Sequence, residues 1–367
     1  MPLRVAIIGG YGNFGGYVAR QLAADGAIEL VICGRNLAKA QGFAAGWQAA
    51  NPAQGARVDI ADPPAHMLGD IAPDLVINMV GPYHGQGYGV AKAAIAVGAH
   101  YCDIADARAF VCGIGQLDTA AREKGVTVLS GASSVPALTA AYCDAALQEM
   151  AQLRRVEYGI SGAEQANRGA GTVAAVLSYV GERFTRLRDG RMQEEIGWRG
   201  AIPVDYPELG RRWFATGDVP DLELFPARYP GLQEHRFLAG HEIAPLHFGL
   251  WFLGALRRLR LIPNLSRYAD MLVKLSKPFN VFGRGRSGFH MVIEGVDESG
   301  AVAVRRHWII ARSGHGPNIP IIPPILIARK FARGEQIEPG ARPCLDVISL
   351  DDYRAAFAGL DIECIDE

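Results

Sequence analysis

The sequence has no long hydrophobic run and no excess of charge of either sign, and these two absences exclude whole classes of protein. Its 367 residues carry 37 Lys and Arg against 38 Asp and Glu, a formal net charge of −1. This balance gives no electrostatic reason to expect a nucleic-acid partner. No apolar stretch reaches the roughly 18–20 residues that a membrane span needs, since the nearest, residues 248–256, ends at Arg257. We therefore expect no nucleic-acid partner and no transmembrane span.

Motifs for disulfides, secretion and metal binding are also missing. The six cysteines contain no C-x-x-C pair, which predicts reduced, mostly buried thiols. The apolar start of the chain is only as long as a strand and does not resemble a signal peptide, so we expect a cytoplasmic protein. His241, Glu242 and His247 lack the H-E-x-x-H spacing, and Pro245 would disturb the helix that this motif needs. No metal site is predicted.

The chain is organised around a glycine-rich turn near its start. Residues 5–16 read Val-Ala-Ile-Ile-Gly-Gly-Tyr-Gly-Asn-Phe-Gly-Gly, an apolar strand that stops at glycines before an apolar-periodic helix. Gly10, Gly12 and Gly15 fit G-x-G-x-x-G, while Gly9, Gly12 and Gly15 fit the looser G-x-x-G-x-x-G. Glycines allow a tight turn and close approach to a pyrophosphate, whose charge the N–H groups of the new helix hold. The turn predicts a dinucleotide site formed by Gly9, Gly10, Tyr11, Gly12, Asn13, Phe14 and Gly15.

Strands and helices alternate over about the first 130 residues. This spacing predicts βαβ units and a doubly wound parallel sheet, an α/β fold. The strands are expected at residues 5–8, 28–33, 57–60, 75–79, 100–103 and 126–129.

The pattern changes after Ser130. A helix is predicted at 136–150, a longer strand at 155–161, and a hairpin from strands 288–296 and 301–311. Residues 197–247 are rich in proline, glycine and aromatics, and we expect loops and short helices there. This later part predicts a second domain.

The residue after the second strand bears on the choice of nucleotide. An NAD site usually places Asp or Glu about 20 residues beyond the glycines, but Arg35 stands there. A guanidinium suits a 2′-phosphate, which a carboxylate would repel. We therefore predict NADP in preference to NAD, with Arg35 on the phosphate. Asp59 closes the predicted third strand and either meets the adenine edge or caps the following turn.

Polar residues follow the fourth and fifth strands. The loop Val80-Gly81-Pro82-Tyr83-His84 follows one, and Asp103 ends the other. In a doubly wound sheet these strand ends face the glycine turn across the topological switch point, so the loop from Val80 to Tyr83 would pass the nicotinamide. Tyr83, His84 and Asp103 are candidate groups for the proton that accompanies a hydride. Equally, Tyr83 could only pack under the ring and Asp103 could only cap a helix.

These motifs together resemble the saccharopine dehydrogenase-like family. The resemblance rests on Gly-Gly-Tyr-Gly-x-x-Gly at 9–15, Val-Gly-Pro-Tyr-x-x-x-Gly at 80–87, Gly-Ala-His-Tyr-Cys-Asp at 98–103 and Gly-Ala-Ser-Ser-Val-Pro at 131–136. It implies a Rossmann NADP-binding domain over 1–133, with 317–367 packing back on it. Residues 134–316 would form an α+β substrate and dimerisation domain with a mixed sheet. The resemblance also implies hydride transfer with NAD(P), typically at an imine or secondary amine, and a homodimer is expected.

Several readings of function remain open. The first is an NADP-dependent oxidoreductase acting on a small C=N or related carbonyl substrate. A second keeps the cofactor and makes the substrate an enoyl or other lipid-like chain, and a third is an NADP-binding protein without turnover. Residues 248–261 read either as a helix that meets a membrane surface or acyl chain, or as a core helix or dimer contact. Arginines of the second domain are candidates for carboxylate binding: Arg168, Arg211, Arg212, Arg284, Arg286, Arg305 and Arg306.

Overall fold

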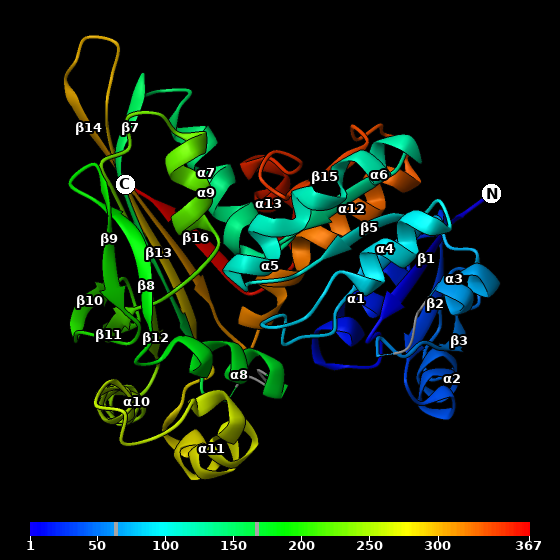
Figure 1. Ribbon diagram of the computed structural model, residues 1–367, viewed down its shortest axis with the longest axis horizontal. Helices are drawn as coiled ribbons and strands as arrows, with labels where there is room; N and C mark the ends of the chain where they lie inside the picture. Colours follow the sequence, from blue (N-terminus) through cyan, green and yellow to red (C-terminus); the bar gives the residue numbers. More distant parts are fainter. Residues whose placement is uncertain (62–64, 166–168) are drawn as a thin grey trace. The chain divides into compact units, whose positions relative to one another are not determined.

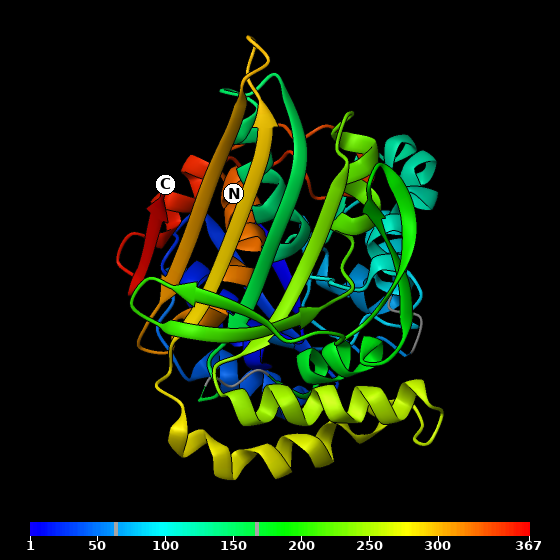
Figure 2. The ribbon, with the colours of Figure 1, turned by 90° about the vertical axis from the view of Figure 1, so that its left-hand side faces the viewer.

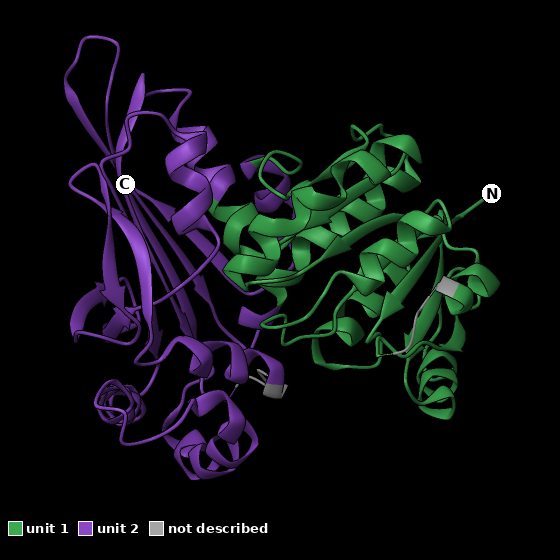
Figure 3. Cartoon of the chain, in the orientation of Figure 1, with its two compact units in different colours: residues 1–139, 318–349 green, residues 140–317, 350–367 purple. Residues whose placement is uncertain are grey.

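The computed structural model describes residues 1–61, 65–165 and 169–367 of the chain. They form two compact units, which Figure 3 colours separately. Unit 1 comprises residues 1–139 and 318–349, and unit 2 comprises residues 140–317 and 350–367.

Unit 1 is built on a parallel sheet of seven strands in the order β15-β6-β5-β4-β1-β2-β3 (Figure 1). The strands are β1 (Leu3–Ile8), β2 (Ile28–Gly34), β3 (Gln54–Arg57), β4 (Leu75–Asn78), β5 (His100–Asp103), β6 (Thr127–Ser130) and β15 (Gly340–Pro343). The predicted doubly wound α/β domain is confirmed. The order doubles back at β1, so β1 and β4 mark the switch point where such sheets bind ligands.

Helices pack on this sheet through small and branched side chains. They are α1 (Asn13–Ala23), α2 (Leu37–Ala45), α3 (Ala65–Ile71), α4 (Gly89–Ala96), α5 (Arg108–Cys112), α6 (Asp118–Glu123) and α12 (Ile322–Ala332). Strand side chains alternate between the two faces. Ala6 and Ile8 of β1 accordingly join one buried cluster with Val90 of α4 and Ala121 of α6. This core holds the carboxyl ends of the central strands rigidly.

Unit 2 is built on a mixed sheet of seven strands in the order β10-β11-β12-β7-β13-β14-β16. The strands are β7 (Gln152–Gly162), β10 (Ile202–Tyr206), β11 (Gly210–Thr216), β12 (Glu234–His241), β13 (Ser287–Val296), β14 (Val302–Ala311) and β16 (Ile362–Asp366). β12 and β7 are parallel, and the other neighbours are antiparallel. A separate hairpin joins β8 (Arg183–Arg188) to β9 (Arg191–Ile196). The expected mixed sheet and the hairpin of β13 and β14 are confirmed.

The loops predicted over residues 197–247 are wrong, because this span holds β10, β11, β12 and the helix α9 (Asp221–Arg228). β12 alternates polar residues with buried His235 and Phe237, the period of two that marks a half-buried strand. Pro203 lies in β10, an edge strand, where proline is tolerated. The aromatics that suggested irregular structure form a small core of Tyr206, Phe214 and Leu238.

The remaining helices of unit 2 frame its sheet. They are α7 (Thr139–Ala146, whose first residue belongs to unit 1), α8 (Gly169–Tyr179), α10 (Ala244–Arg258), α11 (Ala269–Ser276) and α13 (Leu350–Phe357). The sequence predicts that residues 317–367 all pack on the first domain. Residues 318–349 belong to unit 1, but residues 350–367 belong to unit 2. Backbone pairing of β16 with β14 holds this last segment.

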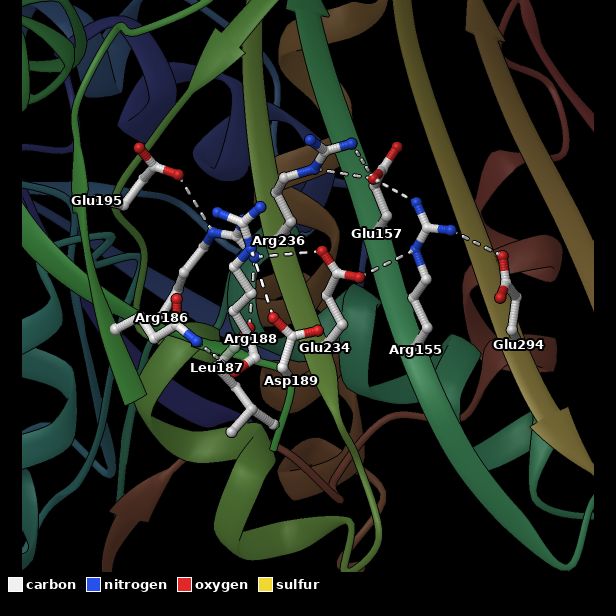
Figure 4. Close-up of polar contacts among 11 residues, drawn as sticks. Arg155, Glu157, Arg186, Leu187, Arg188, Asp189, Glu195, Glu234, Arg236 and Glu294 are labelled. Atoms are coloured by element: carbon white, nitrogen blue, oxygen red, sulfur yellow. Dashed lines mark hydrogen bonds and ion pairs between the residues drawn. The ribbon is translucent and has the colours of Figure 1, made fainter. Parts of the chain in front are cut away.

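An ion-pair network covers one face of the unit 2 sheet (Figure 4). Arg155 on β7 contacts Glu157 and Glu294, each at 3.1 Å. Glu157 also accepts from Nε of Arg236 at 2.8 Å. Although burial opposes it, the Arg236 and Arg155 guanidinium groups hold the pKa of Glu157 below its usual range. The arginines in this network therefore serve to neutralise the carboxylates of neighbouring strands.

Candidate functional site

The glycine turn after β1 is shaped by contacts that admit no side chain. Gly9 has φ of +79°, and a Cβ placed on it would lie 2.8 Å from Val80 Cγ2. A Cβ on Gly15 would overlap the Gly9 carbonyl oxygen and lie 2.8 Å from its carbon. A Cβ on Gly12 would lie 2.9 Å from the same oxygen. A Cβ on Gly10 would likewise lie 2.8 Å from the Ile7 carbonyl oxygen, so the backbone requires glycine at all four positions.

The turn leaves the N-terminus of α1 open. The N-cap is Gly12, and within the described chain no side chain caps the helix and no acidic residue occupies its first turn, where Asn13 and Phe14 lie. The next helix differs, because the Asn36 side chain accepts a hydrogen bond from the Lys39 amide at 2.9 Å. Uncapped amides at a helix N-terminus attract an anion.

Tyr11 ties the glycine turn to the end of β2. Its hydroxyl accepts a hydrogen bond from the Asn36 amide at 3.1 Å. Its ring lies against Gly34, where a Cβ would be 2.6 Å from Tyr11 Cζ. Arg35 lies between these two contacts and is exposed, without an ion pair to the residues that the structure describes. Gly34 therefore belongs to the candidate site, and its only sequence signal is a glycine directly before Arg35.

Asp59 lies beyond the third strand and does not close it. β3 spans Gln54–Arg57 and ends two residues before Asp59. Asp59 is half-buried and its Oδ1 accepts from the Ala61 amide at 3.2 Å. The prediction that the third strand spans 57–60 is wrong, and Asp59 holds the turn that follows.

The loop after β4 packs beside the glycine turn through Val80. Below it, the Tyr83 hydroxyl donates to the Asn78 carbonyl oxygen at 2.8 Å, and the side chain is buried. Burial and the neighbouring Asp103 carboxylate raise the pKa of Tyr83 well above its ordinary value. Gln86 Nε2 donates to the Val80 and Pro82 carbonyl oxygens at 3.0 and 2.7 Å. Both Gly81 and Pro82 are exposed on the loop that these bonds fix.

Asp103 fixes the ends of β5 and β6 to each other. It is fully buried, and its Oδ1 accepts from the Ala105 amide at 2.9 Å, the Gly131 amide at 2.9 Å and the Ser130 hydroxyl at 3.0 Å. Its Oδ2 has no hydrogen-bond partner among the described residues. Burial raises the pKa of Asp103 to about 6, although these hydrogen bonds favour the ionised form.

His84, in the loop after β4, has an exposed imidazole. It interacts electrostatically with Asp106, which follows β5. Burial raises the pKa of Asp106, and the His84 charge opposes this rise. Tyr83, His84 and Asp103 therefore occupy one strand edge, but His84 differs from the other two because its side chain reaches solvent.

Several candidate histidines and arginines of unit 2 are engaged inside that unit. His241 Nδ1 lies 2.9 Å from Glu164 Oε1, and His247 is buried. Burial lowers the pKa of His247 to about 4, with the nearby His241 acting in the same direction. The candidate arginines Arg211, Arg212 and Arg305 bond to Asp205, Ser161 and Glu149, respectively. Arg168 lies outside the described residues.

Comparison with known protein families supports an NADP-binding site in unit 1. Residues 5–129 match the family model of the saccharopine dehydrogenase NADP binding domain. No curated protein sequence matches the chain.

Solved structures resemble the chain to different degrees. Apo saccharopine dehydrogenase (L-Glu forming) from Saccharomyces cerevisiae is 14% identical with a TM-score of 0.71, and 100% of each chain is covered. The amine dehydrogenase from Mycobacterium smegmatis is 12% identical with a TM-score of 0.46, and 96% of each chain is covered. Biliverdin reductase from Synechocystis, in complex with biliverdin and NADP+, is 12% identical with a TM-score of 0.43 over 96% of this chain and 95% of that one. The first of these structures shows that the two units form a saccharopine dehydrogenase-like fold.

Asp103→Asn should flatten the dependence of stability on pH. Because the folded-state pKa is raised, the stability that the protonated carboxyl contributes is fully present below about pH 4 and is lost as pH rises through about 6. A rise from 3.8 to about 6 corresponds to about 3 kcal/mol across this window. Urea unfolding at several pH values between 4 and 7 measures the difference. Asp70→Asn, which removes an exposed carboxylate in α3, is the control, and parallel curves for Asp103→Asn and wild type would contradict the assignment.

Proposed function

We propose that this NAD(P)-dependent oxidoreductase, whose residues 5–129 match the saccharopine dehydrogenase NADP binding domain, transfers a hydride between NADP and the carbon of an imine or secondary amine. The observation that carries the proposal is the exposed His84 imidazole on the β4 loop, which packs beside the glycine turn through Val80. A structure of the same fold is saccharopine dehydrogenase (L-Glu forming), and the resemblance of the sequence motifs to that family implies an imine or secondary amine.

Residues of the glycine turn and of the β2 end would hold the nucleotide. Gly9, Gly12 and Gly15 leave room that a Cβ would fill, and the uncapped start of α1 suits a pyrophosphate. Arg35 would hold the 2′-phosphate, since its guanidinium is exposed and Tyr11 bonds the adjacent Asn36 amide. Asp59 would lie toward the adenine end, because it follows the outermost strand of the sheet.

His84 is the group that we assign to proton transfer. When bound, NADPH supplies the hydride that adds to the C=N carbon. The electron pair of the double bond then moves to nitrogen, which takes a proton from the His84 imidazole in reduction and returns one in oxidation. Asp106 would stabilise the protonated imidazole as a neighbouring anion.

Tyr83 and Asp103 would act by fixing the two loops that carry this chemistry. The Tyr83 hydroxyl is committed to the Asn78 carbonyl, and Asp103 bonds two amides and a hydroxyl. Both side chains are buried, so neither one presents a polar atom at the surface as His84 does. We therefore place them as positioning residues for the Val80–Tyr83 loop and for the β5 end.

Reduction of an enoyl or other lipid-like chain is the second candidate. It is favoured by the large apolar side chains that residues 248–282 expose, which suit contact with an acyl substrate or its carrier. The two candidates use the same cofactor site and differ in the bond that accepts the hydride.

A substrate panel tests the choice between them. Imines formed in solution from 2-oxo acids and primary amines should oxidise NADPH, followed by absorbance at 340 nm, faster than enoyl thioesters do. His84→Gln should lower kcat on the active substrate by about 10²- to 10⁴-fold while NADPH affinity stays unchanged.

His66→Gln is the matched control, because His66 is an exposed histidine that follows β3, three strands away from β4. Faster turnover of enoyl thioesters would overturn the imine proposal in favour of the second candidate. Unchanged turnover in His84→Gln would remove the proton-transfer role, whatever the substrate.

Arg35→Ala should weaken NADPH binding by at least tenfold and leave NADH binding almost unchanged, because only NADPH carries the 2′-phosphate. Fluorescence titration of both cofactors measures this. Lys124→Ala is the control, because Lys124 is an exposed cation just before β6, which lies next to the edge strand β15, on the other side of the sheet from β2. An equal loss for both cofactors would contradict the role of Arg35.

A further inference from the structure

The exposed apolar surface of the protein is concentrated in one segment of unit 2. Fourteen large hydrophobic side chains are exposed in the described chain, and ten lie between residues 248 and 282. The ten are Phe248, Trp251, Phe252, Leu259, Leu261, Tyr268, Met271, Leu275, Val281 and Phe282. Single exposed apolar residues are ordinary, but a contiguous group marks a surface that meets a partner or a membrane.

α10 turns one apolar side outward and is anchored through the other. Phe248, Phe252 and Leu259 recur at helical spacing and are exposed, with Phe252 57% accessible. On the opposite side Arg257 donates to the Ser178 and Val180 carbonyl oxygens at 3.1 and 2.9 Å. Buried His247 accepts through its carbonyl oxygen from Trp198 Nε1 at 3.2 Å. The helix is therefore held firmly with its aromatic side toward solvent.

α11 continues this surface. Met271 and Leu275 are exposed one turn apart, and Val281 and Phe282 follow in the next short helical turn, 70% or more accessible. Figures 1 and 2 both place α10 and α11 at the same end of unit 2. We call the exposed side chains of residues 248–282 the basic apolar face.

The charges on this face are nearly all positive. Its exposed cations are Arg258, Arg260, Arg267, Lys274 and Lys277, and Asp270 is its exposed anion. None of these six forms an ion pair with the described part of the chain, whereas the whole protein carries a formal net charge of −1. Positive charge and exposed aromatics are thus combined on one surface.

We propose that the basic apolar face docks the protein onto an anionic lipid surface. Aromatic and aliphatic side chains insert at the headgroup boundary of a bilayer while arginine and lysine contact lipid phosphates. Among the described residues, no helix is long and apolar enough to cross a membrane, so the contact is peripheral. A second copy of this chain fits the face less well, because a symmetric contact would bring the same unpaired cations together. The proposal does not depend on the substrate of the enzyme.

Sedimentation with sucrose-loaded vesicles tests the proposal on the full chain. Vesicles of phosphatidylcholine with 30% phosphatidylglycerol should bind the protein at least tenfold more strongly than vesicles of phosphatidylcholine alone, and 0.5 M salt should weaken the binding. Trp251→Ser with Phe252→Ser should lower the affinity at least tenfold, and Lys274→Glu with Lys277→Glu should do the same. Met192→Ser with Val302→Ser, which removes exposed apolar side chains elsewhere in unit 2, should bind as wild type does.

Far-ultraviolet circular dichroism of each variant shows whether its fold is retained. Failure of wild-type protein to sediment with anionic vesicles at millimolar lipid would overturn the proposal. It would also fail if the variants on the face bound as wild type does. Light scattering that shows a wild-type dimer, and a monomer for Trp251→Ser with Phe252→Ser without lipid, would assign the face to a second copy instead.

Discussion

The close packing of α1 on the end of β1 is the constraint on which the candidate site depends. No side chain fits at Gly15 while the Gly9 carbonyl keeps its place, and Gly9 itself turns at positive φ against Val80. Because the helix starts so near the strand end, its uncapped amides lie at the switch point between β1 and β4. The same packing places the β4 loop beside the glycine turn through Val80. The glycine turn, which would hold the cofactor, and the β4 loop, which carries His84, are therefore joined by the contact of the Val80 side chain with Gly9.

Buried polar groups then fix the loops around this contact. Tyr11 bonds the backbone next to Arg35, Tyr83 bonds the backbone of β4, and Asp103 bonds the backbone that follows β6. Tyr11 and Asp103 join neighbouring strand ends, whereas Tyr83 holds the β4 loop to its own strand. Such bonds limit motion where a dinucleotide and a substrate have to be oriented. His84 is exposed on the β4 loop and is the group that we propose exchanges a proton with a small molecule.

Much of unit 1 could be predicted from the sequence, because its signals are local. Apolar runs of strand length, glycines and helical spacing follow directly from residues such as Ile8, Gly15 and Leu22. Unit 2 was predicted less well, since β10, β11 and β12 depend on partners distant in sequence and carry polar residues on one face. The inward direction of Tyr83 could not be predicted either, because it depends on the Asn78 carbonyl and on a ring contact with Phe110 at 5.2 Å. Sequence alone also could not tell whether the apolar residues of α10 face the core or solvent.

NADPH titration of Gly15→Ala and Gly16→Ala tests most directly whether the cofactor site depends on the close packing of α1 at Gly15. The two glycines are adjacent in α1, but a Cβ on Gly16 makes only ordinary contacts, with the Phe43 ring at 3.4 Å and with Arg20 Nη1 at 3.8 Å. If NADPH binding needs a glycine at residue 15, Gly16→Ala should bind NADPH as wild type does. Gly15→Ala should lose binding by at least tenfold while circular dichroism still shows a folded protein. Equal NADPH affinity in the two variants would contradict this dependence.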